Sequence, residues 1–290
     1  MVETPAPTPP PGPVAAAAAA APPPRPDVVE FLGVTKRFGD TTVIKDVTFT
    51  VEDRPERGEF VTILGPSGCG KSTVLRLIAG LRPHHPATAG RVLVGGKPVA
   101  HPGPDRGMVF QDYTSFDNRT VEDNVAFGLE CRGVSRRERR ARAREWIAKV
   151  GLNVERDAHK YPAALSGGMR QRVAIARTLI LGPRIILMDE PFGALDPATR
   201  LKMQELLVRL WREAEATVFF VTHSIEEAVY LGDRVYVFSA APGTIVRQLP
   251  LPQSDAPPQE KQRDPEFLDV VADLRSTLEK YEGHITDAVD

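Results

Sequence analysis

The 290-residue sequence lacks several features that would mark a secreted, membrane-spanning or nucleic-acid-binding protein. It contains only two cysteines, Cys69 and Cys131, which exclude a disulfide framework and favour a reducing compartment. No stretch approaches the ~18 consecutive apolar residues that a membrane-spanning helix needs. The 37 Lys and Arg nearly balance the 38 Asp and Glu, and a net charge of -1 gives no indication of nucleic-acid binding.

The first 26 residues have a composition that differs from the rest of the chain, because 18 of them are Pro or Ala. Such a segment cannot bury a core, so residues 1–26 are predicted to form a disordered, dispensable tail rather than a binding arm. Its apolar run at 14–21 is preceded by Glu3 and by no basic residue. A signal peptide needs a positive region there, so export is not expected.

Residues 27–250 have the pattern of one α/β domain. Residues 28–51 predict antiparallel strands, and short apolar strands alternate with amphipathic helices after Gly182, which predicts a parallel sheet. Residues from about 112 to 170 predict a helical subdomain, whose arginine run is interpreted as a solvated helix face. Residues 251–290 predict a C-terminal extension with one amphipathic helix, N-capped by Asp264 and with an apolar stripe at Phe267, Val270, Val271, Leu274 and Leu278.

A phosphate-binding loop is predicted where GPSGCGKST follows a buried strand and precedes a helix. Its backbone N–H groups and the helix N-terminus favour phosphate, Lys71 is expected to reach the β- and γ-phosphates, and Ser72 to hold Mg²⁺. Cys69 lies beside Lys71 at the helix start, so a lowered thiol pKa is expected, with alkylation blocking nucleotide binding. The loop residues are Gly65, Pro66, Ser67, Gly68, Cys69, Gly70, Lys71, Ser72 and Thr73.

Four polar residues follow the predicted strands. Asp189 and Glu190 end the strand RIILMDE, and adjacent strand residues point to opposite sides, so one carboxylate can serve a metal and the other a water. Gln111 and His223 each end another strand. Ligands collect at the carboxyl ends of parallel strands, so these side chains are predicted to converge near Lys71. Each alone could equally be a satisfied polar residue.

A second glycine-rich turn occurs in LSGGMRQRVAIAR, at Ser166, Gly167 and Gly168. It precedes a predicted helix like a phosphate loop, but it carries no lysine, and the chain already has a complete phosphate loop. The residues alone do not explain this turn.

With these motifs in order, residues 28 to 250 resemble the ATP-binding cassette ATPases. Phe38 is similar to the aromatic that stacks on adenine, although tyrosine is more usual there; Gly65–Thr73 resembles the Walker A loop, Gln111 the Q-loop, LSGGM the family signature, IILMDE the Walker B strand, GALD with Asp196 the D-loop, and His223 the switch histidine. The resemblance implies ATP and Mg²⁺ as cofactors. It implies Ser72, Gln111 and Asp189 at the metal, and Lys71, Gln111, Glu190 and His223 as catalytic residues.

The resemblance also implies a use for the lysine-free turn. Cassettes of this family pair head to tail, and each ATP lies between the Walker A loop of one subunit and the signature turn of the other. Ser166, Gly167 and Gly168 are therefore expected to bind the nucleotide of a second subunit, which could be a second copy or a paralogue.

Local sequence is most similar to the nitrate, sulfonate and taurine importer group, notably in DEPFGALD and THSIEEAVYLGDRVYVFSAAPGTIV. This implies a peripheral ATPase on the cytoplasmic face of the inner membrane, with a separate permease, an indirect solute-binding protein and no nucleic acid. The alternatives are an importer of another solute, such as polyamine or glycine betaine, and a soluble cassette ATPase outside transport, acting as a regulator or nucleic-acid factor. DYTSFDNRTVEDN departs from the group and leaves the permease and the solute open, and VEDRPERGEF carries a few extra residues.

Overall fold

The computed structural model describes residues 26–54, 57–112, 114–251 and 256–282. The predicted Pro/Ala tail lies outside the described residues except for Pro26. No helix in the described part of the chain is long and apolar enough to span a bilayer.

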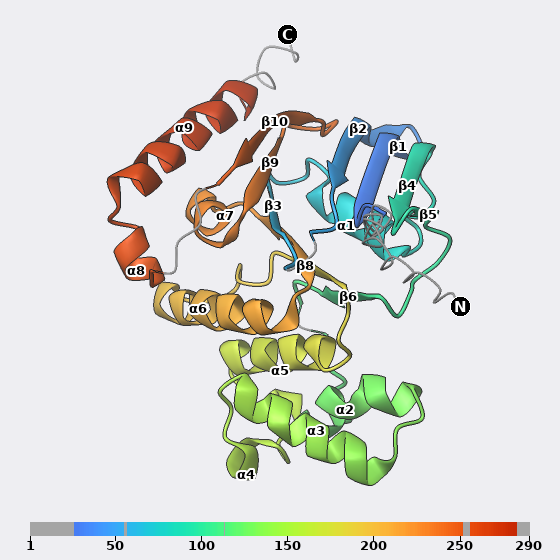
Figure 1. Ribbon diagram of the computed structural model, residues 1–290, viewed down its shortest axis with the longest axis vertical. Coiled ribbons are helices and arrows are strands. Elements are labelled where there is room, and N and C mark those ends of the chain that lie inside the picture. Colours follow the sequence, from blue (N-terminus) through green and yellow to red (C-terminus); the bar gives the residue numbers. More distant parts are fainter. Residues whose placement is uncertain (1–25, 55–56, 113, 252–255, 283–290) are drawn as a thin grey trace, which may run out of the picture.

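A six-stranded sheet forms the centre of the molecule, in the order β10-β9-β3-β8-β7-β6 (Figure 1). Five strands are parallel, as the alternating pattern predicts, and β10 joins the edge antiparallel to β9. Every residue of β3, β7 and β8 is buried, because both faces of the sheet are covered. The strands are β3 Phe60–Leu64, β6 Arg106–Val109, β7 Ile185–Asp189, β8 Thr217–Thr222, β9 Arg234–Phe238 and β10 Ile245–Pro250.

One face of this sheet is covered by α1, Lys71–Ala79, and by a second, antiparallel sheet. That sheet has the order β2-β1-β4-β5, with β1 Val29–Phe38, β2 Thr41–Val51, β4 Ala89–Val94 and β5 Lys97–Pro98. Phe31 and Phe49 stack at 4.5 Å between ring centroids, and Phe49 also lies 5.0 Å from Tyr236 of the central sheet. These aromatic contacts bury the inner face of the antiparallel sheet against the central one.

The other face is covered by a layer of helices that extends below the sheet in Figure 1. The helices are α2 Val121–Cys131, α3 Arg136–Lys149, α4 Val154–Asp157, the 3₁₀ turn η1 Pro162–Ala164, α5 Gly167–Leu179 and α6 Pro197–Ala214. All but α5 and α6 lie inside the predicted helical range of about 112–170; α5 begins there and continues to Leu179. On α3, Arg140 and Arg144 both pair with the buried carboxylate of Glu122, so part of the arginine run is neutralised.

Six helices begin in the same way. The side chain before each first turn accepts a hydrogen bond from the backbone N–H three residues later, which satisfies one of the free donors of the helix. These N-cap residues are Thr120, Ser135, Asn153, Ser166, Asp196 and Ser224. Three of them, Ser166, Asp196 and Ser224, lie in or beside predicted site motifs.

The C-terminal extension packs on the outer edge of the central sheet, against α7, Ile225–Leu231. The predicted helix is α9, Pro265–Glu282, and Asp264 accepts from the backbone N–H of Glu266 at 3.1 Å. A one-turn helix that the sequence does not predict, α8 at Pro258–Lys261, precedes it. The predicted stripe faces α7 and β9, with Phe267, Val271, Leu274 and Leu278 buried and Val270 partly buried.

Candidate functional site

The phosphate-loop sequence forms the turn between β3 and α1. Gly68 and Gly70 have φ values of 80° and 97°, in the left-handed region that favours glycine. A Cβ on Gly70 would also collide with the side chain of Ile44 on β2. The two glycines therefore let the loop curl over the start of α1, where free backbone N–H groups attract anions.

Lys71 is the first residue of α1 and is only 4% exposed. Its Nζ donates to the carbonyl oxygens of Gly65 and Pro66, each at 2.8 Å. An ammonium group has three donors, so one remains for an anion beside the loop. The loop thus holds its own lysine at the position where a phosphate would need a positive charge.

Ser72 joins the loop to the first of the two predicted carboxylates. Its Oγ donates to Oδ1 of Asp189 at 2.7 Å, and Nη2 of Arg76 lies 3.5 Å from Oδ2. Burial raises the pKa of Asp189, while the Ser72 hydrogen bond and the Arg76 charge oppose that rise. A hydroxyl oxygen and a carboxylate oxygen side by side are the kind of ligands that Mg²⁺ prefers.

Glu190 has a backbone conformation that non-glycine residues rarely adopt, with φ at 46°. The conformation is held because the Glu190 N–H donates to Val221 O at 3.1 Å and the Glu190 carbonyl accepts from Gly193 N at 3.2 Å. Its carboxylate Oε2 lies 3.3 Å from Nδ1 of His223, at the end of the neighbouring strand β8. Strain of this kind is characteristic of functional sites.

A pocket of about 370 Å³ opens at this edge of the sheet. It joins the phosphate loop, the segment after β6 and the segment after β7, and it contains four of the predicted catalytic or metal residues. The described residues that line it are Val43, Ser67, Gly68, Gly70, Lys71, Ser72, Thr73, Gln111 and Glu190. Asp189 and His223 adjoin it through their contacts with Ser72 and Glu190. The structure therefore brings together the polar residues at the strand ends, which the sequence predicted to converge near Lys71.

Other predicted site residues do not line this pocket among the described residues. The Phe38 ring meets His84 edge-on, with centroids 5.2 Å apart, and Nζ of Lys36 lies 5.0 Å from its centroid. Asp196 starts α6, where its carboxylate accepts from the Thr199 N–H at 3.0 Å. A hydrogen bond with the side chain of Thr199, and next this backbone N–H contact, lower the pKa of Asp196 from its usual value.

The signature turn also lies outside the pocket, at the start of α5. Ser166 is exposed and its Oγ accepts from the Met169 N–H at 3.3 Å. A Cβ on Gly167 would meet nothing within 4 Å, whereas one on Gly168 would touch Thr199 of α6. The turn thus presents an open helix N-terminus, suited to an anion, with no phosphate loop of its own chain against it.

The expected reactivity of Cys69 is wrong. Cys69 belongs to the loop, but its side chain is completely buried in the core that α1 and the antiparallel sheet share, and burial raises the pKa of Cys69 although Lys71 acts to lower it. The sequence shows the neighbouring lysine and the helix start but not the packing that removes water from the sulfur. Because the thiolate is the reactive form, a raised pKa and full burial both protect Cys69.

We expect a maleimide to label the native protein once, at the exposed Cys131, and to leave nucleotide binding intact. Labelling is counted by intact-mass spectrometry and binding by fluorescent-nucleotide titration. Cys131→Ser is the matched control and should remove the native label, while urea should expose Cys69. Rapid double labelling of the folded protein would contradict the burial of Cys69.

Several residues of the site were not predicted from the sequence. Arg76, one helical turn after Ser72, reaches Asp189. Glu227 accepts from the hydroxyl of Thr222, the residue before His223. The sequence Ser224-Ile-Glu-Glu227 is a capping-box pattern, which could have indicated that Glu227 turns back toward the start of its helix, although not that it contacts Thr222.

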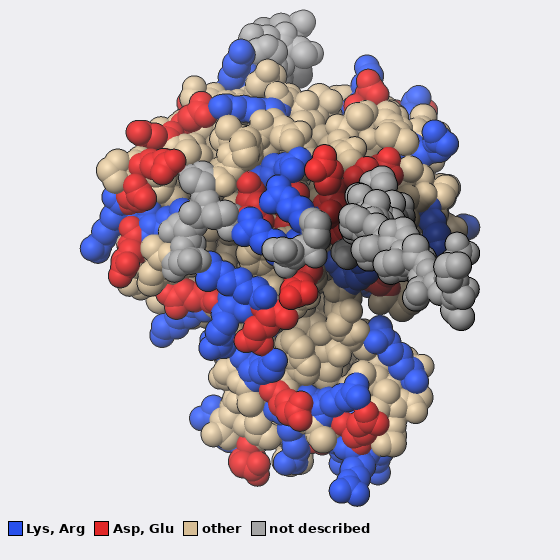
Figure 2. All heavy atoms as spheres, in the orientation of Figure 1, with Lys and Arg blue, Asp and Glu red and all other residues tan. Residues whose placement is uncertain are grey.

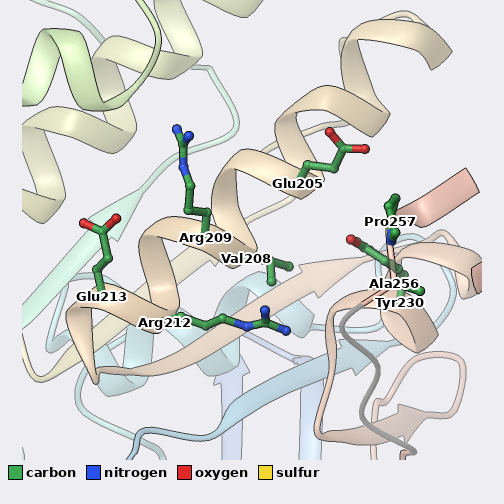
Figure 3. Close-up of a pocket in the computed structure, with 8 residues that line it drawn as sticks. All are labelled: Glu205, Val208, Arg209, Arg212, Glu213, Tyr230, Ala256 and Pro257. Carbon is green, nitrogen blue, oxygen red and sulfur yellow. The ribbon is translucent and has the colours of Figure 1, made fainter.

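A larger hollow of about 480 Å³ lies elsewhere, between α6, α7 and the start of α8 (Figure 3). Its lining contains none of the predicted site residues, and consists of Glu205, Val208, Arg209, Arg212, Glu213, Tyr230, Ala256 and Pro257.

Figure 2 shows basic and acidic side chains close to one another over much of the face in view.

Comparison with known proteins gives consistent matches. The ABC transporter family profile matches residues 44–193. The nitrate import ATP-binding protein of Synechocystis sp. is 44% identical over 257 residues, covering 87% of this chain and 93% of the relative. The taurine import ATP-binding protein of Rhizobium johnstonii is 53% identical over 216 residues, covering 74% of this chain and 79% of the relative. A solved dimeric, post-hydrolysis ATP-binding cassette bound to ADP and Pi has 36% identity and a TM-score of 0.65, covering 78% of this chain and all of that one.

Proposed function

The chain belongs to the ABC transporter family, and we propose that it is the ATP-hydrolysing subunit of an importer that takes up a small anion through a separate permease. The observation that carries the proposal is the contact at 3.3 Å between Glu190 and His223 at the edge of a pocket lined by the phosphate loop. This arrangement joins a phosphate-binding loop to a base for water.

The residues of the pocket divide the chemistry among them. The phosphate loop with Lys71 binds the β- and γ-phosphates, and Ser72, Gln111 and Asp189 would hold Mg²⁺, which neutralises charge on the phosphates. Glu190 accepts the proton of the water that attacks the γ-phosphorus. His223 orients the Glu190 carboxylate from the end of β8.

The signature turn completes the site of a second subunit. Ser166, Gly167 and Gly168 would offer a hydroxyl and helix N-terminal N–H groups to the nucleotide held by the partner's loop. Asp196 would adjoin the same interface, and Phe38 would stack on adenine. The dimeric state of the related cassette supports this arrangement, and closure upon ATP would shift the permease between its states.

The solute is proposed from the relatives named for nitrate and taurine import, two small solutes that each carry a negatively charged oxygen group, a nitrate or a sulfonate. The protein would then act at the cytoplasmic face of the inner membrane, beside a permease that receives solute from a binding protein. Import of polyamine or glycine betaine is the alternative within transport. A soluble ATPase that regulates other proteins or acts on nucleic acid is the alternative outside it.

Reconstituted uptake tests the proposal. The neighbouring genes are first searched for a permease and a solute-binding protein. The chain is then co-expressed with the proteins found, and proteoliposomes are assayed for ATP-dependent uptake of labelled nitrate, sulfonates and taurine. Lys71→Ala in place of the wild-type chain should abolish uptake, because its loop loses the ammonium group. ATP hydrolysis without a co-purifying permease would favour the soluble alternative.

A further inference from the structure

The backbone around His223 is held by its two neighbours in the sequence and by α7. Ser224 caps α7 and accepts from the Glu227 N–H at 3.2 Å. In the usual capping box the glutamate would accept the N-cap N–H directly. Here the Ser224 N–H donates instead to Thr222 Oγ1 at 3.0 Å, and Thr222 Oγ1 donates to Glu227 Oε2 at 2.6 Å. The Thr222 hydroxyl thus relays the hydrogen bond across His223.

The direction of this relay is fixed by its donors. Because Thr222 Oγ1 accepts the Ser224 N–H, its own proton is directed to the Glu227 carboxylate. Thr222 is 2% exposed and Glu227 is 6% exposed, so water does not compete for these groups. Removal of one partner would leave a buried polar group unsatisfied, which favours a rearrangement of the backbone that the group supports.

The other oxygen of Glu227 faces α6. Gln204 Nε2 donates to Glu227 Oε1 at 3.4 Å, and Arg200 Nε lies 3.7 Å from the same oxygen. Arg200 also donates through Nη2 to the carbonyl of Leu195 at 3.1 Å, and its own N–H donates to Asp196 O at 2.9 Å. Glu227 therefore connects the loop that ends at Asp196 with the strand end that carries His223.

The His223 side chain lies at the surface of the site. It is 55% exposed, and its Nδ1 lies 3.3 Å from Oε2 of Glu190. An exposed imidazole is placed by the backbone that carries it, and the residues on both sides of His223 belong to the relay. A shift of this backbone would move the ring away from Glu190.

We infer that Glu227 is a positioning residue for ATP hydrolysis, which acts through Thr222 to fix His223 against Glu190 and links that histidine to the Asp196 loop. This inference rests on the proposed roles of Glu190 and His223. It predicts a loss of turnover with intact nucleotide binding, because neither Glu227 nor Thr222 lines the phosphate pocket.

The test compares two substitutions at Thr222 that differ in the hydroxyl. Thr222→Val keeps the shape and removes the relay, and is expected to lower kcat about tenfold or more with KM for ATP near the wild-type value. Thr222→Ser keeps the hydroxyl and is expected to restore most of kcat. Glu227→Gln keeps an acceptor oxygen but loses the charge beside Arg200, so an intermediate kcat is expected.

Glu213→Gln is the control for the same chemical change away from the relay, because Glu213 lies at the surface near the end of α6 and pairs with Lys149. It should keep wild-type kcat. Thermal unfolding and fluorescent-nucleotide binding of every variant show whether the protein is folded at the assay temperature. Equal kcat for the Val and Ser variants, or a kcat loss accompanied by an equal loss of nucleotide binding, would overturn the inference. Absence of hydrolysis by the wild-type protein would instead refute the proposed function.

Discussion

Glu190→Gln is expected to lower ATP turnover by about 10²–10⁴-fold while leaving ATP binding intact. The amide has the shape of the carboxylate and can still contact His223, but it cannot take a proton from water. If ATP closes the dimer and hydrolysis reopens it, this variant should accumulate as a dimer in ATP. Phosphate release measures turnover, and size-exclusion chromatography with light scattering measures the dimer.

Glu205→Gln provides a control with the same chemical change, since Glu205 lies on α6 at the remote hollow. It should hydrolyse ATP at the wild-type rate and remain in the wild-type association state. If the Glu190→Gln protein stays monomeric in saturating ATP, the prediction is contradicted. Hydrolysis at Glu190 would then not be the step that reopens the dimer.

Ser166→Arg is expected to abolish turnover without affecting nucleotide binding by the single subunit. The substitution places a long cation where the open turn of α5 would meet the partner's nucleotide, while the phosphate loop of the same chain lies elsewhere. Loss of the N-cap also costs about 0.5–2 kcal/mol. Ser135→Arg on α3 removes an equivalent cap and is the matched control, for which activity should persist.

Mixing two inactive variants gives a stricter measurement. In a dimer with twofold symmetry, a subunit with Lys71→Ala and one with Ser166→Arg combine both defects in one site and leave the other site intact. Turnover should therefore reappear in the mixture although neither variant is active alone. A mixture as inactive as its components would contradict the proposed composite site, provided that heterodimers are detected.

The sequence predicted the parts of the site that depend on local order. A glycine loop between strand and helix predicted the surroundings of Lys71, and parallel strands predicted that Asp189, Glu190, Gln111 and His223 would gather at one edge. The first prediction depends only on the order of strand, loop and helix along the chain. The second depends only on the direction of each strand in the sheet.

Features that depend on packing were not predicted. Cys69 is protected because its side chain packs in the core between the central sheet, α1 and the antiparallel sheet, which no neighbour in the sequence indicates. Arg200 and Glu227 lie 27 positions apart, and only the packing of α6 against α7 brings them together. Phe38 was predicted as the aromatic that stacks on adenine. Its ring contacts His84 in the structure, and the sequence analysis did not single out that histidine.

The exposed turn at Ser166 has a consequence for the cell as well as for the enzyme. A site divided between two chains is assembled by collision, so a dilute subunit would hydrolyse little ATP and would waste little when it is not engaged. Two subunits bound to one permease would instead face each other at a high effective concentration, without any increase in their intrinsic affinity. Under that arrangement the membrane complex sets when the cassette becomes an ATPase.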